Sequence, residues 1–424
     1  MTDTDRRGAC SSRDDRIPVS DREILLPQKH LNMAFFVVTI MVITTIQWIM
    51  LDMYLPALPV LKEEFHTTES MLNITINAGI VSTAISTLFS GTISDRFGRK
   101  PVLLTGLIGS AVCIFLCAFS KDVFTMAALR AAGGLGTGAV LTVTSAMIKD
   151  SFTGRRFERV MTLLQSIAAL GPLFAPTLGS FLINVSSWHS IFYFLGIATG
   201  ITTIPILIST ETWPKESRVS EHMSAVVKEA LSIARAPAFA LFLGVAAFLT
   251  IPVWAYIAIS SYVYINDFGI SNIAYGVYYA VGAGMSILAP FLYMILVRRF
   301  SGARVVAVTI AMVLAGALSL LLIGRLHPLI FMFSIVPLML AEGMIRPLSI
   351  VVLLDEYSYA AGSASALMQF VINVVGIVGT SLATLAWSSM ITGTGLISLG
   401  CGVTALVLWI LMRRRQLLRE RLKY

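Results

Sequence analysis

The sequence predicts an all-α integral membrane protein whose twelve transmembrane helices form two six-helix, pseudo-symmetric bundles. Three observations predict this class: few charged residues, twelve long apolar runs, and basic residues placed mainly on one side. Charged residues are 13% of the 424 residues, hydrophobic residues are 56%, and mean hydropathy is +0.82. Soluble domains average about 25% charged residues, so most of the outer surface is expected to face lipid.

Each apolar run is long enough to cross a bilayer core, which takes roughly 20 residues. Hydrocarbon offers no hydrogen-bond partners to the backbone, so each run is expected to be a helix. The runs are expected at residues 33–57, 70–94, 101–120, 123–147, 157–184, 187–209, 237–264, 272–296, 304–323, 328–352, 363–387 and 392–412.

Basic residues lie mainly on one side of these spans. With the N-terminus in the cytoplasm, 26 of the 31 Lys and Arg residues fall in cytoplasmic tails and loops. Lys62, Lys121 and Arg325 fall on the opposite side, while Arg130 and Arg346 lie within spans. This bias predicts a multi-pass protein of the bacterial inner membrane with both termini cytoplasmic. Nucleic acid is not an expected partner despite the net charge of +8, because the basic residues sit in short clusters between apolar runs.

The longest interior polar stretch, residues 210–236, divides the chain into two halves. Its apolar residues recur at helical spacing, which predicts either an amphipathic helix on the inner leaflet or a solvated linker helix. The basic loops 95–100 and 298–304 each follow the second span of their half, as in an internal repeat. The predicted organisation is a cytoplasmic tail 1–32, a bundle 33–209, a linker 210–236, a bundle 237–412 and a basic cytoplasmic tail 413–424.

Five segments carry recognisable motifs. They are Gly91-Thr-Ile-Ser-Asp95-Arg-Phe-Gly98-Arg99-Lys100, Leu51-Asp52-Met-Tyr54-Leu-Pro56-Ala-Leu-Pro59, Leu129-Arg130-Ala-Ala-Gly-Gly134-Leu-Gly136-Thr-Gly138, Gly171-Pro172-Leu-Phe-Ala-Pro176-Thr-Leu-Gly179 and Ala360-Ala-Gly362-Ser-Ala-Ser-Ala-Leu367-Met368. Over roughly residues 33–410 the chain resembles the major facilitator superfamily, specifically its twelve-helix drug:proton antiporters and their bicyclomycin/chloramphenicol-resistance subgroup. The resemblance implies the major facilitator fold and a proton-coupled antiporter that exports small organic compounds by alternating access.

Two features depart from that pattern. Gly133 stands where the family usually has Gln, three residues after the helix-four Arg, and the tenth helix carries Glu342 and Arg346 where the subgroup is mostly apolar. A Glu/Arg pair lining a cavity would suit a polar, anionic or zwitterionic solute, with Arg346 as its anchor. Because the two residues are four apart, a self-neutralised ion pair within the helix is an equal alternative.

Asp52 and Arg130 are the other charged residues expected inside spans. A charge in hydrocarbon costs several kcal/mol, so it usually faces a partner or a water-filled cavity. Asp52 is expected about 8 Å from the outer end of its helix and Arg130 about 12 Å from the same side, which places them within one turn in depth. We expect Asp52 to carry the coupling proton and Arg130 to be its neighbour. The alternatives are a permanent structural ion pair and an Asp52 that reaches the outer interface.

Other polar and aromatic residues within the spans are candidates to line the substrate cavity. Interhelical hydrogen bonding is the commoner role for such residues. Six tyrosines of helices seven and eight, at positions 256, 262, 264, 275, 278 and 279, are expected mainly to form an aromatic belt at the outer interface. The substrate-binding candidates, besides Glu342 and Arg346, are Gln47, Trp48, Asn77, Gln165, Tyr256, Gln369 and Asn373.

Gating and helix bending are assigned to two of the motifs. A bridge from basic residues of loop 95–100 to the acidic inner end of helix ten would lock the outward-open state, with surface solvation as the alternative. The gating candidates are Gly91, Asp95, Arg96, Gly98, Arg99, Lys100, Asp355 and Glu356. The resemblance assigns a bend in helix five to Gly171, Pro172, Pro176 and Gly179.

Signatures of catalysis are missing from the sequence. There is no Gly-rich phosphate-binding loop and no metal-spaced cluster of His, Cys and carboxylates, so we expect neither an enzyme, nor an ATP-driven pump, nor a metal site. The expected partners are a small-molecule substrate, protons as the coupling ion and the lipid bilayer, with no other cofactor and a monomeric chain. The alternatives are a transporter of one polar or anionic metabolite and a non-transporting membrane sensor on the same fold.

Overall fold

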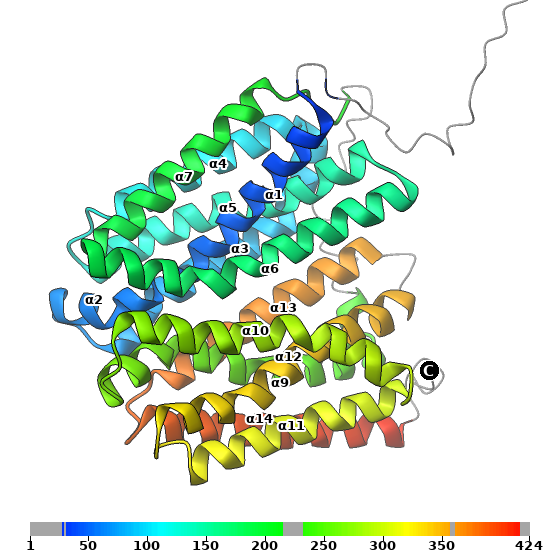
Figure 1. The fold of residues 1–424 in the computed structure, drawn as a ribbon. Helices are drawn as coiled ribbons and strands as arrows, with labels where there is room; N and C mark the ends of the chain where they lie inside the picture. The colour runs from blue at the N-terminus through cyan, green and yellow to red at the C-terminus, as the bar shows by residue number, and fades with distance from the viewer. Residues whose placement is uncertain (1–27, 29–30, 215–231, 357–360, 416–424) are drawn as a thin grey trace, which may run out of the picture.

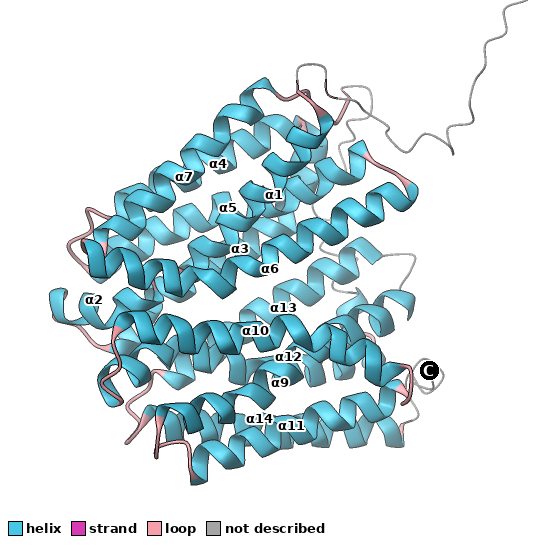
Figure 2. Ribbon diagram, in the orientation of Figure 1, coloured by secondary structure: helices cyan, strands magenta, loops and turns pink. Residues whose placement is uncertain are grey.

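The computed structural model describes residues 28, 31–214, 232–356 and 361–415, without the side chains of residues 169, 354–356, 361–363, 365 and 366. All regular elements in these ranges are helices (Figure 2). The first half contains α1 (Met33–Asp52), η2 (Leu55–Ala57), α2 (Leu58–Glu64), α3 (Glu69–Phe97), α4 (Arg99–Cys117), α5 (Val123–Ser151), α6 (Gly154–Val185) and α7 (His189–Ile208). The second half contains α9 (Pro237–Ser261), η4 (Tyr262–Asp267), α10 (Asn272–Val297), α11 (Gly302–Leu322), α12 (Pro328–Glu356), α13 (Ala361–Ala383) and α14 (Met390–Arg414).

The long helices form two bundles, one from each half of the chain (Figure 1). Helices α1 and α3–α7 make the upper bundle of the view, and α9–α14 make the lower one. The helix α2 lies at one end of the molecule, which we call the α2 end. The last described residues of the chain lie at the opposite end, which we call the termini end.

Each predicted apolar run contains a long helix. Among the described residues, eleven helices are long and apolar enough to cross a membrane, and α13 contributes the shorter apolar helix Leu367–Ala383. The predicted class, an all-α membrane protein with two bundles, is therefore confirmed. The linker expected at 210–236 lies mostly outside the described residues, so its predicted amphipathic helix stays a prediction.

The first span is broken, which the sequence analysis did not anticipate. It was expected to run unbroken through residue 57, but α1 ends at Asp52, and the short helices η2 and α2 carry the chain on to Glu64. Pro56 and Pro59 occupy the first turns of η2 and α2. Proline has no N–H to donate to the preceding turn, so it fits the start of a helix and not its interior. Asp52 therefore lies at a helix break and not inside an unbroken helix.

Glycines bring α5 close to its neighbours in the first bundle. A Cβ added at Gly134 would lie 2.6 Å from the carbonyl oxygen of Gly79 in α3. A Cβ added at Gly136 would lie 2.5 Å from the carbonyl oxygen of Gly106 in α4. Only a residue without a side chain fits these backbone contacts. This packing fixes α3, α4 and α5 as one unit, and Arg130 projects from it.

The two bundles touch through polar contacts near the α2 end. Asn73 and Asn77, in the first turns of α3, hydrogen-bond to residues at the end of α13. The bonds run from Asn73 Nδ2 to Thr384 Oγ1 (3.1 Å), from Asn77 Nδ2 to Ser381 Oγ (3.0 Å), from Thr380 Oγ1 to Asn77 Oδ1 (2.6 Å) and from Ser70 Oγ to the Thr384 carbonyl. We call these six residues the α3–α13 clasp.

A second contact between the bundles joins α6 to α10 near the same end. Thr177 Oγ1 donates to the carbonyl of Gly276 at 3.0 Å. A Cβ at Gly276 would lie 2.8 Å from Thr177 Cα, so the helices touch backbone to backbone. The inter-bundle hydrogen bonds of the described residues thus gather at the α2 end.

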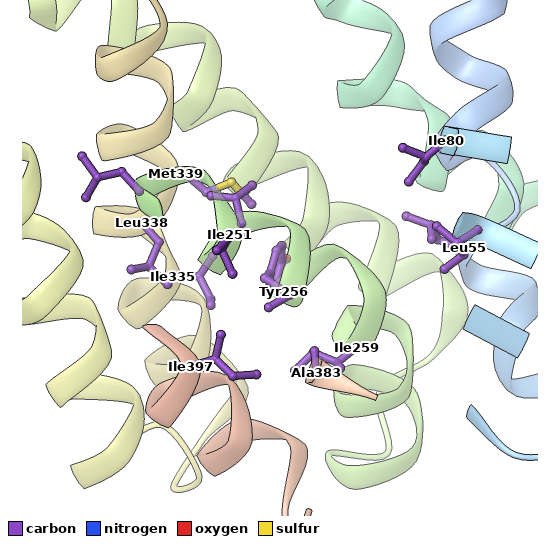
Figure 3. Close-up of a cluster of buried hydrophobic side chains, with 14 of the residues drawn as sticks. Leu55, Ile80, Ile251, Tyr256, Ile259, Ile335, Leu338, Met339, Ala383 and Ile397 are labelled. Atoms are coloured by element: carbon purple, nitrogen blue, oxygen red, sulfur yellow. The ribbon is translucent and has the colours of Figure 1, made fainter. Parts of the chain in front are cut away.

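The tyrosines of the second bundle are buried rather than arranged as a belt. Tyr256, Tyr264, Tyr275 and Tyr279 are at most 3% exposed. Tyr264 stacks on Tyr278 with ring centroids 5.0 Å apart, and Tyr256 stacks on Tyr279 at 6.0 Å. The expected interface belt was wrong, because these rings face one another across α9, η4 and α10 and fill the bundle interior. Figure 3 shows Tyr256 among buried apolar side chains of this bundle.

Candidate functional site

Arg130 projects from α5 into the first bundle and is 4% exposed. Its Nε donates to the carbonyl of Thr75 in α3 at 2.9 Å. Its guanidinium carbon lies 3.9 Å from the ring centroid of Tyr54, a cation–π contact. The guanidinium lies beside Gly79 of α3, where an added Cβ would make ordinary contact with Arg130 Nη2 at 3.5 Å. Arg130 is therefore held by α3 and by the break after α1.

Asp52 lies at that break, two residues before Tyr54. Its side chain is partly exposed and interacts electrostatically with Arg130. Asp52 and Arg130 do not form a direct ion pair with each other among the described side chains. The prediction that they are neighbours agrees with this geometry, whereas a permanent direct ion pair does not. A carboxylate near an immobilised cation, but not bonded to it, remains free to gain and lose a proton.

Gln47 and Trp48 take different positions on α1. Gln47 is 0% exposed, and neither its amide nitrogen nor its amide oxygen has a hydrogen-bond partner among the described residues. Trp48 is partly exposed and packs on α6. A Cβ added at Gly171 of α6 would lie 3.1 Å from the Trp48 Cβ. The structure thus fully buries Gln47 and leaves Trp48 partly exposed.

Glu342 and Arg346 form the predicted ion pair within α12, between Arg346 Nε and Glu342 Oε1. The two side chains differ sharply in exposure, with 7% for Glu342 and 44% for Arg346. The pair thus has a buried acid and an exposed base. Residue spacing alone could not reveal this asymmetry.

The remaining predicted cavity residues divide into exposed and engaged groups. Gln165 of α6 and Gln369 of α13 are exposed, and Gln369 Nε2 donates to Asn373 Oδ1 at 3.2 Å. Asn77 instead belongs to the α3–α13 clasp, and Tyr256 is 1% exposed in the second bundle. In this state, Asn77 and Tyr256 are packed against protein.

The predicted gating loop is held within its own bundle. Gly98 joins α3 to α4 with φ 101° and ψ 152°, a backbone conformation open essentially to glycine alone. Arg99 bridges Asp95 at 2.6 Å and Asp150 of α5 at 2.9 Å. Sequence reasoning missed Asp150, although its place at the inner end of helix four, level with the loop, could have indicated it.

Residues after α7 also hold this loop, and they were missed as well. The carboxylate of Glu211 accepts from the Arg99 amide at 2.9 Å at the start of α4, where backbone N–H groups lack partners within the helix. Trp213 Nε1 donates to the Asp95 carbonyl at 3.1 Å, and its ring lies 4.8 Å from the Arg99 guanidinium carbon. No motif in the sequence marks Glu211 or Trp213.

The other gating candidates make local contacts or fall outside the described side chains. Lys100 Nζ donates to the carbonyls of Leu207 and Ser209, both at 2.8 Å. Arg96 is exposed, with its guanidinium carbon 5.3 Å from the Phe97 ring centroid. A Cβ at Gly91 would make only ordinary contact with Thr142, at 3.8 Å. The side chains of Asp355 and Glu356 are outside the described ones, so the predicted bridge to them stays a prediction.

The predicted bending motif lies where α6 meets the break after α1. Helix α6 is assigned as continuous from Gly154 to Val185, with Pro172 and Pro176 inside it. A Cβ at Gly179 would lie 1.9 Å from the Met53 carbonyl oxygen. The glycines of this motif therefore let α6 pack directly on the broken segment beside Asp52.

Two apolar six-helix bundles, with charged side chains held inside the spans, define a multi-pass membrane protein of the secondary-transporter class. The chain belongs to the Major Facilitator Superfamily, whose sequence profile matches residues 40–380. It is therefore a membrane transporter for small molecules.

The chain is similar to named members of this superfamily. It is 28% identical to the uncharacterized MFS-type transporter YdgK of Bacillus subtilis over 75% of this chain and 80% of that protein. It is 24% identical to the bicyclomycin resistance protein homolog of Haemophilus influenzae over 69% of this chain and 73% of the relative. The multidrug resistance protein MdtL of Klebsiella pneumoniae is 32% identical over 38% of this chain and 42% of its own length.

Solved structures share the fold. A bacterial homolog of the human lysosomal transporter Spinster has a TM-score of 0.73 at 12% identity, covering 90% of this chain and 97% of the other. The nucleoside transporter NupG has a TM-score of 0.71 at 12% identity, covering 89% and 99%. At these identities the likeness is one of fold.

Proposed function

We propose that the protein is a proton-coupled antiporter that exports small organic compounds from the bacterial cytoplasm by alternating access. Relatives named for multidrug and bicyclomycin resistance support this substrate class. The excess of basic residues in the tails and in the loops at the termini end supports a cytoplasmic location for that end. The chain acts as a monomer in the inner membrane and needs no cofactor besides protons.

The observation that carries this proposal is the setting of Asp52 and Arg130. Arg130 is fixed by the Thr75 carbonyl and the Tyr54 ring, while Asp52 lies nearby at a helix break without an ion-pair contact among the described side chains. Loss of water around the carboxyl group favours the neutral acid and the guanidinium favours the carboxylate, so the two effects oppose each other. Opening the site to one side of the membrane changes this balance, and Asp52 can then carry a proton across.

The same residues are connected to the contact between the bundles. Thr75, which receives the Arg130 hydrogen bond, lies between Asn73 and Asn77 on α3. A change of charge at Asp52 that shifts Arg130 would therefore act on the turns of α3 that hold α13. This gives the proton a physical route to the opening of the α3–α13 clasp.

The conformation described here fits one state of the cycle. Because the inter-bundle hydrogen bonds gather at the α2 end, and the orientation above makes that end the outer one, this state is closed outside and faces inward. The opposite state needs its own contacts at the inner end. A bridge from Arg96 or Lys100 to Asp355 or Glu356 would supply them, while Arg99 stays bound to Asp95 and Asp150.

Reconstitution in proteoliposomes tests the proposal. With bicyclomycin as probe, the purified chain should release protons on addition of substrate and should accumulate substrate when a proton gradient is imposed. Asp52→Asn should abolish both, because an amide side chain cannot bind and release a proton as a carboxylate does. The matched control Asp267→Asn, at an exposed carboxylate after α9, should leave both intact.

Two outcomes would contradict the proposal. Full gradient-driven exchange by Asp52→Asn would remove the assigned proton carrier. Substrate binding without any proton movement in the unmodified chain would favour the non-transporting sensor.

A further inference from the structure

One strip of α12 changes from buried to exposed along its length. It consists of Ile335, Met339, Glu342, Arg346 and Ile350, which recur at intervals of three and four residues and so share one face. Ile335 is 1% exposed, Met339 3% and Glu342 6%, whereas the Arg346 side chain is 44% exposed and Ile350 is 49% exposed. The side chains of the strip are thus buried toward the α2 end and exposed toward the termini end.

This face is not the lipid face of α12. Leu329, Phe333 and Val351, exposed at 44%, 65% and 58%, gather on another side of α12, which we take as its lipid face, and Ile350 lies between that side and Arg346. At 3.6 residues per turn, Arg346 lies roughly 100–140° around the helix from the residues of that face. A permanently charged guanidinium in a membrane span is expected to face water or a partner. The exposed part of the strip therefore borders a space that opens toward the termini end.

The buried part of the strip packs on α9 and α10. Ser286 Oγ of α10 contacts the Met339 sulfur at 3.3 Å, and a Cβ at Gly282 would lie 3.7 Å from Met339 Cε and 3.8 Å from the Tyr256 hydroxyl. Figure 3 shows Met339, Ile335 and Tyr256 in this buried cluster. An apolar, aromatic-lined interior thus lies one turn beyond the Glu342–Arg346 pair.

The pair presents hydrogen-bond donors to the open side. Glu342 is buried and engages Arg346 through Nε. The closest contact of the pair is the one at Nε, and within the part of the chain that the structure describes Nη1 and Nη2 of Arg346 donate no hydrogen bond. These two groups form one edge of a planar fork that matches the two oxygens of a carboxylate. Glu342 neutralises and orients the guanidinium, but it is too buried to receive a substrate ammonium.

From this geometry we propose that Arg346 is the anchor for substrates that carry a carboxylate next to an apolar or aromatic body. The inference rests on the proposed transport function and adds organic anions, as distinct from zwitterions and lipophilic cations, to the small organic compounds that the chain exports. The carboxylate binds the Nη edge of Arg346 from the termini end, and the apolar body lies beside the exposed part of the α12 strip at Ile350. Glu342 is a positioning residue that holds the fork.

Binding of matched compounds to the purified full-length chain in nanodiscs tests this proposal. Benzoate, benzamide and benzylamine share a ring and differ in charge, and 2-naphthoate, 2-naphthamide and 2-naphthylmethylamine extend the ring. Each carboxylate should bind roughly ten-fold or more tightly than its amide, as expected for a charge-assisted hydrogen-bonded pair. In Arg346→Gln the carboxylate and its amide should bind with nearly equal affinity, and Arg346→Lys should keep part of the preference for the carboxylate. Arg299→Gln, at an exposed Arg of the termini end, should leave it unchanged.

A second measurement, in a chain that retains Arg346, follows the reactivity of a cysteine introduced at position 350. Ile350→Cys in a chain whose four native cysteines are replaced by Ser should react with a membrane-impermeant maleimide from the termini end. 2-Naphthoate should slow this reaction, and 2-naphthamide should not. The proposal is overturned if amides or amines bind as tightly as the carboxylates, if no carboxylate binds, or if the ratio survives Arg346→Gln. It is equally overturned if the thiol introduced by Ile350→Cys does not react from that end.

The two proposals can fail separately. Asp52→Asn should lose proton-driven exchange but keep the preference for carboxylate over amide, because Asp52 lies in the other bundle. If the unmodified chain shows that preference but no proton coupling, only the proposed antiport fails.

Discussion

Arg130 Nε donates to the backbone carbonyl of Thr75 at 2.9 Å, which ties the buried cation of α5 to the part of α3 that binds the second bundle. Thr75 Oγ1 also lies 3.2 Å from the Tyr54 hydroxyl, at the break after α1. One turn of α3 thus joins three elements: the helix break with Asp52, the cation Arg130 and the α3–α13 clasp. A shift of this turn of α3 would therefore affect both the surroundings of Asp52 and the α3–α13 clasp.

The contact between Arg130 and Thr75 leads to a prediction for Arg130→Lys. Lysine keeps the charge but loses the Nε donor and the flat face that contacts Tyr54. Loss of a hydrogen bond to a charged group costs about 1.5–3 kcal/mol. We expect proton-driven exchange in proteoliposomes to fall roughly ten-fold or more. Arg325→Lys, at an exposed Arg in the loop after α11, is the control and should exchange at the unmodified rate.

The α3–α13 clasp leads to a second prediction. Asn77→Ala removes two hydrogen bonds between the bundles, one to Ser381 and one from Thr380. At about 0.5–1.5 kcal/mol each, their loss should shift the equilibrium toward opening of the α2 end by roughly 1–3 kcal/mol. Spin labels at Glu63 and Ser388, one on each bundle at this end, should show a larger population of long distances. Asn266→Ala removes an exposed amide at the same end and should not change the distribution.

Gly98 leads to a third prediction, which concerns stability. With φ 101° and ψ 152°, a side chain at this position strains the backbone by about 1–3 kcal/mol. Gly98→Ala should lower the thermal unfolding temperature of the purified protein. Gly200→Ala in α7, where an added Cβ meets nothing within 4 Å, is the matched control and should not lower it. An unchanged unfolding temperature for Gly98→Ala would mean that the joint between α3 and α4 relaxes freely.

Asp122 leads to a fourth prediction, which concerns pH. Its carboxylate accepts from the Thr125 hydroxyl at 2.6 Å and from the Thr125 amide at 2.8 Å, capping α5 before its span begins. These hydrogen bonds hold the pKa of Asp122 below its ordinary value. The cap therefore contributes fully above the unfolded-state pKa and is lost as the pH falls through the folded one.

Amide exchange at Thr125 measures this effect. The protection factor of the Thr125 amide should drop as the pH falls below the ordinary Asp range, near about 4. Asp122→Asn keeps an oxygen acceptor and should remove the pH dependence. A protection factor that falls equally in Asp122→Asn would assign the change to another group.

Much of the site could be anticipated because charges in apolar runs are conspicuous. Asp52, Arg130, Glu342 and Arg346 stand out in the sequence, and the depth argument placed the first two together. It could not find the break after α1, because the prolines that begin η2 and α2 can also be accommodated inside a span, as they are in α6. Burial of the tyrosines was missed because an aromatic near a span end looks the same whether it faces lipid or another ring.

The sequence by itself determined the spans, the two halves and the charge bias, because the cost of polar groups in lipid acts on each segment separately. Tertiary structure alone decided which polar residues bind across the bundles and which face open space. Asn77 is engaged with α13, Gln47 is fully buried, and Arg346 is exposed while Glu342 is not. Those outcomes depend on how helices far apart in the chain pack together, and helical spacing carries no information about that packing.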